Sequence, residues 1–138
     1  MKAYAVIDTN VLVSSMLTRR DDSPTKRVID AIASGDIVPL YSNEILEEYE
    51  EVLLRPKFPF RAENVRAVIN TFRALGIAVN PSPTGEVLPD MNDLPFYEVV
   101  MEKRDDDAYL VTGNARHFPK RRFIVTPAEM MEMVDARL

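Results

Sequence analysis

Apolar residues follow two alternating patterns along this chain. Five short runs are almost continuously apolar, at residues 2–7, 37–41, 77–79, 108–112 and 123–126. Such runs are typical of strands that are buried on both faces of a sheet. The segments between most of these runs place apolar residues three or four positions apart, which predicts amphipathic helices. The chain is therefore expected to alternate strands and helices.

Capping and helix-breaking residues support the predicted helices. Ser23 precedes Pro24 at the start of one helix, and Gly35 follows its end. Ser42 is placed to cap the next helix, which is expected to end before Pro56. Further helices are expected from residue 11, over residues 62–75, after Asp93 and from residue 127.

The alternation of elements determines the predicted fold class. Helices that connect continuously apolar strands favour an α/β protein, with three layers (α/β/α) and a central parallel sheet of about five strands. Residues 81–89 are rich in Pro, Ser and Gly and are expected to form a loop. No linker or internal repeat divides the sequence, so we expect a single domain over residues 1–138.

Composition excludes several classes of protein. None of the 138 residues is cysteine, which rules out a disulfide framework, a thiol nucleophile and a zinc site made of thiolates. The first apolar run is interrupted at Asp8 and Asn10, so it is too short for a membrane span or a signal peptide. These features predict a cytoplasmic protein with no membrane contact.

The balance of charges is acidic. The chain has 17 Lys and Arg against 22 Asp and Glu, which gives a formal net charge of −5. Proteins that hold nucleic acids by bulk electrostatics are usually basic, so this balance argues against a nonspecific polyanion binder. It is compatible with an enzyme that meets phosphates through a cation, because the carboxylates that hold the cation are themselves negative.

Several polar side chains are expected at one edge of the predicted sheet. Ligands of parallel α/β sheets bind where the strands end, and the connecting helices begin at that same edge. Asp8 ends the first strand, and Asn114 follows the fourth. Asp90 and Asp93 lie where a later helix begins, and Asp93 is also expected to cap that helix. Residues 105–107, all aspartate, precede a strand and therefore belong to the opposite edge.

The third predicted helix offers two further acidic candidates. Its apolar stripe is centred near Tyr49 when residues are placed about 100° apart. Glu48 and Glu50 flank this stripe on its two sides, at similar distances from the packed surface. Periodicity alone does not choose between them.

Carboxylates that meet at one edge suggest a particular chemistry. They repel one another, and each raises the pKa of its neighbours. A divalent cation removes this penalty, and hard oxygen ligands favour Mg²⁺ or Mn²⁺ over zinc. Such an ion, together with a substrate phosphate, supports phosphodiester hydrolysis. Thr112 and Arg116 are candidates for contact with that substrate, whereas His117 is expected to be structural and is left out of the catalytic set.

Four motifs follow in order over most of the chain. The first is VIDTNVLV at residues 6–13, and the second is SNEILEEY at 42–49, followed by RPKF at 55–58. The third is DMND at residues 90–93. The fourth is LVTGN at 110–114, with RHFP at 116–119 and IVTP at 124–127. Together these motifs resemble those of PIN-domain ribonucleases, and the resemblance covers residues 6–127.

The resemblance implies a PIN-like fold and a Mg²⁺- or Mn²⁺-dependent endoribonuclease, often the toxin of a bacterial toxin–antitoxin pair. It carries the metal-binding acids of the family onto Asp8, Glu48 and Asp93. Glu48 is thereby preferred to Glu50 by analogy. The implied partners are an RNA substrate and an antitoxin protein, and a homodimer is common in the family.

Asn114 departs from the pattern of the family, because many members have an acid at this position. An amide oxygen brings no charge, so we expect one bound ion, with Asn114 completing the catalytic set. Asp90 is expected to be an accessory acid. The departure also supports an alternative function, a non-catalytic PIN-fold module that binds RNA or a protein partner. Acyl-phosphate transfer at Asp8 is disfavoured, because chemistry of the haloacid dehalogenase type would need an aspartate where this chain has Asn10.

Overall fold

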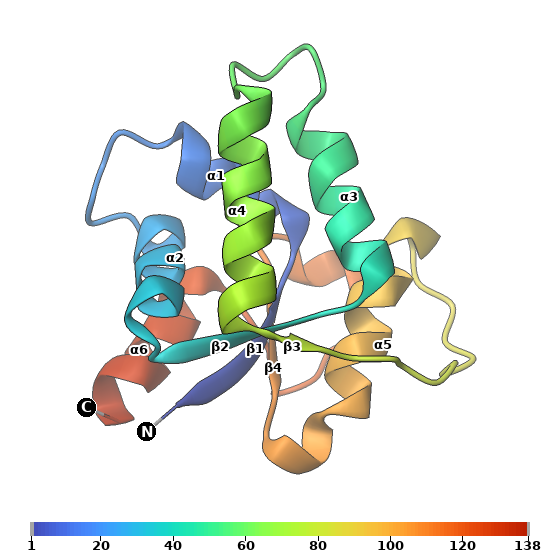
Figure 1. Cartoon of the computed structure of the whole chain (residues 1–138). Helices are drawn as coiled ribbons and strands as arrows, with labels where there is room; N and C mark the ends of the chain where they lie inside the picture. Colours follow the sequence, from blue (N-terminus) through green and yellow to red (C-terminus); the bar gives the residue numbers. More distant parts are fainter. Residues whose placement is uncertain (1, 138) are drawn as a thin grey trace.

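Five parallel strands form the centre of the molecule in this computed structural model, which describes residues 2–137 (Figure 1). The strands follow the predicted apolar runs and are β1 (Ala3–Ile7), β2 (Ile37–Tyr41), β3 (Ile77–Ala78), β4 (Tyr109–Val111) and β5 (Ile124–Val125). Their order in the sheet is β3-β2-β1-β4-β5, and every neighbouring pair is parallel. The predicted α/β class and the sheet of five strands are confirmed.

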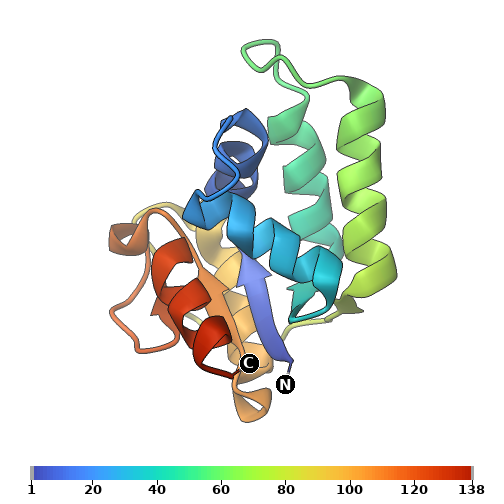
Figure 2. The same ribbon diagram turned by 90° about the vertical axis from the view of Figure 1, so that its left-hand side faces the viewer.

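Within the described residues, six α-helices and three short 3₁₀ turns connect or follow the strands. The helices are α1 (Thr9–Leu17), α2 (Pro24–Ser34), α3 (Asn43–Leu53), α4 (Ala62–Leu75), α5 (Leu94–Glu102) and α6 (Pro127–Arg137). The 3₁₀ turns are η1 (Met91–Asp93), η2 (Arg104–Asp106) and η3 (Ala115–His117). Helices α2 and α6 pack together on one face, and α5 covers β1, β2 and β4 on the other (Figures 1 and 2). No helix within residues 2–137 is long and apolar enough to span a membrane.

The strand order places a topological switch point beside β1. The chain leaves β1 toward β2 on one side and later returns to β4 on its other side. Open α/β sheets bind their ligands in the crevice that such a reversal leaves at the carboxyl ends of the strands. The carboxyl ends of β1 and β4 are therefore the expected place for a site.

Tyr49 fixes the distance between α3 and this switch point. Its ring is fully buried and packs edge-on against Phe72, with ring centroids 5.3 Å apart, and against Phe96 at 6.2 Å. Its hydroxyl donates a hydrogen bond to the carbonyl oxygen of Ile7, the last residue of β1. Because a buried hydroxyl without a partner would be costly, this bond favours one depth of α3 against β1. The residue before Tyr49, Glu48, is thereby held near the end of β1.

Candidate active site

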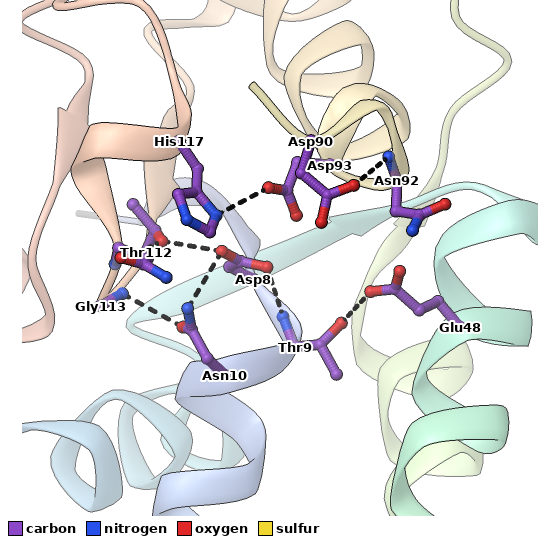
Figure 3. Close-up of polar contacts among 11 residues, drawn as sticks. Asp8, Thr9, Asn10, Glu48, Asp90, Asn92, Asp93, Thr112, Gly113 and His117 are labelled. Carbon is purple, nitrogen blue, oxygen red and sulfur yellow. Dashed lines mark hydrogen bonds and ion pairs between the residues drawn. The ribbon is translucent and has the colours of Figure 1, made fainter. Parts of the chain in front are cut away.

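Asp8 lies at the carboxyl end of β1 and is only 5% exposed (Figure 3). The backbone N–H of Thr9 donates to its Oδ1 at 2.8 Å, and the hydroxyl of Thr112 donates to its Oδ2 at 2.7 Å. The side-chain amide of Asn10 approaches Oδ2 at 3.4 Å, while its own oxygen accepts from the backbone N–H of Gly113 at 3.1 Å. These contacts join the ends of β1 and β4 around one carboxylate.

Burial and neighbouring charge shift the proton affinity of these acids. Burial raises the pKa of Asp8 to about 6; the negative charge of Asp93 adds to this effect, and the hydrogen bond from Thr112 opposes it. Burial also raises the pKa of Glu48 and of Asp93 above their usual values, and here the charges of Asp8 and Asp90 respectively contribute. The three carboxylates therefore repel one another in a partly dry environment, as expected for a site that attracts a cation.

Glu48 is the glutamate of α3 that faces this site. Its Oε2 accepts a hydrogen bond from the hydroxyl of Thr9, the residue that follows Asp8. Glu50 is exposed on another side of α3 and lines a groove that α3 forms with α4. Helical periodicity did not distinguish Glu48 from Glu50. In the folded protein α3 is oriented so that Glu48, and not Glu50, lines the pocket that contains Asp8.

Asp93 and His117 meet on the other side of the site. The imidazole Nδ1 of His117 lies 3.2 Å from Oδ2 of Asp93 (Figure 3). The predicted capping role of Asp93 is wrong, because its side chain makes no capping hydrogen bond to α5. The backbone at Asp93 is already helical, since η1 continues directly into α5, so the carboxylate is available to other groups. His117, which was expected to be structural, lines the same pocket as Asp93.

The two remaining polar candidates at this edge, Asp90 and Asn114, each take part in a hydrogen bond with a residue two positions away. Asp90 caps η1, and its Oδ1 accepts from the backbone N–H of Asn92 at 2.9 Å. The backbone N–H of Asn114 donates to the hydroxyl of Thr112 at 2.9 Å. Asp90 and Asn114 both line the pocket that contains Asp8.

The acidic pocket has a volume of about 460 Å³ at the carboxyl edge of the sheet. It brings together the predicted site residues Asp8, Glu48, Asp90, Asp93 and Asn114, with His117. The aspartates at residues 105–107 lie outside it, where η2 leads into the start of β4. Three residues at the pocket were not expected there: Thr9, Asn10 and His117. Each lies within a few residues of the end of β1 or β4.

Two residues that were predicted to contact the substrate, Thr112 and Arg116, do not line the acidic pocket. Thr112 is fully buried, and its hydroxyl is engaged with Asp8 and with the backbone of Asn114. This geometry favours positioning of Asp8 over contact with substrate. Arg116 is exposed in η3 and lines a neighbouring hollow with Lys120 and Arg121.

Replacing Thr112 with valine tests this positioning role. The change keeps the shape of the side chain but removes the hydroxyl that donates to Asp8 and accepts from the N–H of Asn114. We therefore expect the free energy of unfolding to fall by about 1–2 kcal/mol. Urea denaturation measures the loss. Thr112→Ser keeps the hydroxyl and should restore most of the lost stability, whereas an equal loss in the two variants would contradict the role.

The donor set of the pocket fits a hard divalent cation in its chemistry. All the acidic groups offer carboxylate oxygens, which Mg²⁺ and Mn²⁺ prefer. Within residues 2–137, no three Asp, Glu or His side chains lie close enough in this conformation to hold an ion together. In this conformation the Glu48 carboxylate accepts a hydrogen bond from Thr9, and the Asp93 carboxylate contacts His117.

Comparisons with known proteins agree with this architecture. The family model of the PIN domain matches residues 4–116. No curated protein matches the sequence. A chain in the crystal structure of VapBC2 from Rickettsia felis, bound to a DNA fragment from its promoter, aligns with a TM-score of 0.51 and 16% identity, over 82% of this chain and 89% of that one. This likeness shows a shared fold. Since the family model spans residues 4–116, from β1 into η3, and includes every acidic residue of the pocket, the chain belongs to the PIN domain family.

Proposed function

We propose that this protein is a metal-dependent endoribonuclease that hydrolyses phosphodiester bonds of RNA. The observation that carries the proposal is the buried Asp8, whose pKa of about 6 reflects burial and the nearby charge of Asp93, in a pocket that also contains Glu48. Buried carboxylates with raised pKa values gathered in one pocket are typical of functional sites. Membership of the PIN domain family supports a nuclease in particular.

Asp8, Glu48 and Asp93 are the residues that would hold one Mg²⁺ or Mn²⁺ ion. When bound, the ion would neutralise their charge and that of the phosphate and would activate a water molecule. The residues around these ligands orient them. The N–H of Thr9 and the hydroxyl of Thr112 fix Asp8.

Three further residues have proposed roles around the ligands. The imidazole of His117 holds the Asp93 carboxylate until an ion competes for it. Asn114 lines the pocket with a neutral amide that can orient a water molecule or a phosphate oxygen. Arg116 lies outside the pocket, where its guanidinium can contact a backbone phosphate of RNA.

The proposed partner is an antitoxin protein, with this chain as the toxin. The resemblance of the motifs to PIN-domain toxins supports this proposal, and so does the likeness to a chain of VapBC2 from Rickettsia felis. An uncontrolled ribonuclease would damage its own cell, so a protein that blocks the acidic pocket is a natural counterpart. A homodimer is compatible with the proposal.

Addition of Mg²⁺ or Mn²⁺ to the metal-free protein is expected to stabilise it and to start RNA cleavage. An ion at about 100 times its dissociation constant adds about 2.7 kcal/mol to stability, which corresponds to a rise in Tm of roughly 5–10 °C for a chain of this size. A thermal melt and a gel assay with end-labelled RNA, each with and without EDTA, measure the two effects. Absence of both would contradict the proposal and favour a non-catalytic PIN-fold module.

A further inference from the structure

An aromatic side chain lines the acidic pocket without a role in holding an ion. Phe58 lies in the loop between α3 and α4, is half-buried, and faces the pocket that contains Asp8 and Glu48. Its ring stacks on that of Phe60, with centroids 5.4 Å apart and planes inclined by 17°. Phe60 in turn packs against the hydrophobic core. Phe58 is therefore a supported flat surface at the wall of the pocket.

The charge around Phe58 is opposite to that of the pocket floor. Residues 55–61, with the sequence RPKFPFR, contain three cations and no acid, in a chain with a net charge of −5. The ammonium of Lys57 lies 5.1 Å from the centroid of the Phe58 ring. Arg55 also lines the pocket, and its guanidinium pairs with Glu51 on the exposed side of α3. The loop thus combines an aromatic face with cations beside a carboxylate cluster.

This combination matches the chemistry of single-stranded nucleic acids. Unpaired bases stack on aromatic side chains while nearby Lys and Arg contact the backbone phosphates. A base-paired nucleotide cannot offer its face in this way, because both faces are covered by its neighbours in the helix. A phenyl ring offers no ligand to a hard metal ion, so metal binding alone does not account for an aromatic side chain at the wall of this pocket.

We propose that Phe58 stacks against an unpaired base of single-stranded RNA beside the phosphate that is cleaved, and that Lys57 contacts the backbone. The inference rests on the proposed ribonuclease function and adds to it the two residues that contact the base and the backbone beside the acidic pocket. Lys57 is exposed and its contact with the ring is weaker than the stacking of a base, so an incoming base displaces the ammonium. The displaced ammonium is then free to meet a phosphate of the same strand.

Binding of RNA to a cleavage-deficient form separates this inference from the proposed activity. We use Asp8→Asn as the background and measure fluorescence anisotropy with a labelled single-stranded RNA of about ten nucleotides, within the range of known single-strand sites. Phe58→Ala in this background is expected to weaken binding about 10-fold or more, and Phe58→Trp to retain it. Leu54→Ala is the matched control, because Leu54 is an exposed apolar residue next to the same loop but outside the pocket. It should leave binding unchanged.

Abasic nucleotides test whether the contact is with a base. A scan of single abasic sites along the RNA should find one position at which loss of the base weakens binding as much as Phe58→Ala does. At that position the two changes should not add, because both remove the same contact. A duplex of the same sequence should bind the background protein about 10-fold or more weakly than the single strand.

Several results would overturn the inference. Equal binding of single strand and duplex would contradict it, as would full additivity of Phe58→Ala with every abasic site, or an unchanged affinity of the Phe58→Ala variant. Each of these outcomes leaves the ribonuclease proposal intact if the protein with Asp8 still cleaves RNA in Mg²⁺. Loss of cleavage in all forms, with stacking still detected, would instead refute the proposed activity alone.

Discussion

Replacing Asp8 with asparagine is expected to slow RNA cleavage by about 10³-fold or more, because an amide removes both a charge and a ligand oxygen at the centre of the pocket. The fold should be retained, since the amide has the size of the carboxylate it replaces. Initial cleavage rates at saturating Mg²⁺ measure the loss, and circular dichroism checks the fold. Cleavage at the rate of the unaltered protein would place the reacting centre elsewhere.

The same substitution is expected to make the protein more stable at neutral pH. Asp8 has a pKa of about 6 in the folded protein, against an ordinary value of 3.8. The folded state therefore holds a proton between about pH 4 and pH 6 that the unfolded chain has released, so stability falls as pH rises through this window. Above pH 6 the buried charge of Asp8 remains a full penalty, which asparagine does not carry.

The expected gain is smaller than the shift in pKa alone would give. A difference of about two pKa units corresponds to roughly 3 kcal/mol, but the amide has a single oxygen to serve both Thr9 and Thr112. We therefore expect asparagine to raise the free energy of unfolding by about 1–2 kcal/mol at pH 7 and to lower it by about 1 kcal/mol at pH 4, where Asp8 carries almost no charge in the folded protein and the lost hydrogen bond is no longer offset. Urea denaturation in EDTA at both pH values measures this. A variant that is less stable than the original at pH 7 would mean that the carboxylate serves the fold.

The fold was predictable because its signals are local. The continuous apolar runs and the caps at Ser23 and Ser42 each depend on neighbours in sequence, and both serines do accept backbone hydrogen bonds from their helices. The edge rule then groups Asp8, Asn114 and the acids before α5 without any coordinates. Strands β3, β4 and β5 are each shorter than the apolar runs predicted for them, so the ends of these strands were less predictable than their positions.

The hydrogen-bond partners within the site were not predictable in this way. Thr112 donates to Asp8 across 104 positions of sequence, and His117 meets Asp93 across 24. A hydroxyl at the end of β4 has the same local pattern whether it faces a substrate or a carboxylate. The rotation of α3 about its axis is likewise determined by distant residues, above all by the contact of Tyr49 with the carbonyl of Ile7.

The two glutamates that flank Tyr49 offer the sharpest comparison between sequence and structure. Glu48→Gln should lower RNA cleavage roughly 10²-fold, because it removes a charged ligand from the pocket that contains Asp8. Glu50→Gln, two residues away on an exposed face of the same helix, should leave the rate within about twofold. Both substitutions are glutamate to glutamine in the same helix, so helix propensity and net charge change equally in the two variants.

Initial cleavage rates at equal Mg²⁺ concentration show which of the two glutamates serves the reaction. A large loss in Glu50→Gln with none in Glu48→Gln would mean that α3 presents its other flank to the RNA, which the hydrogen bond from Thr9 to Glu48 argues against.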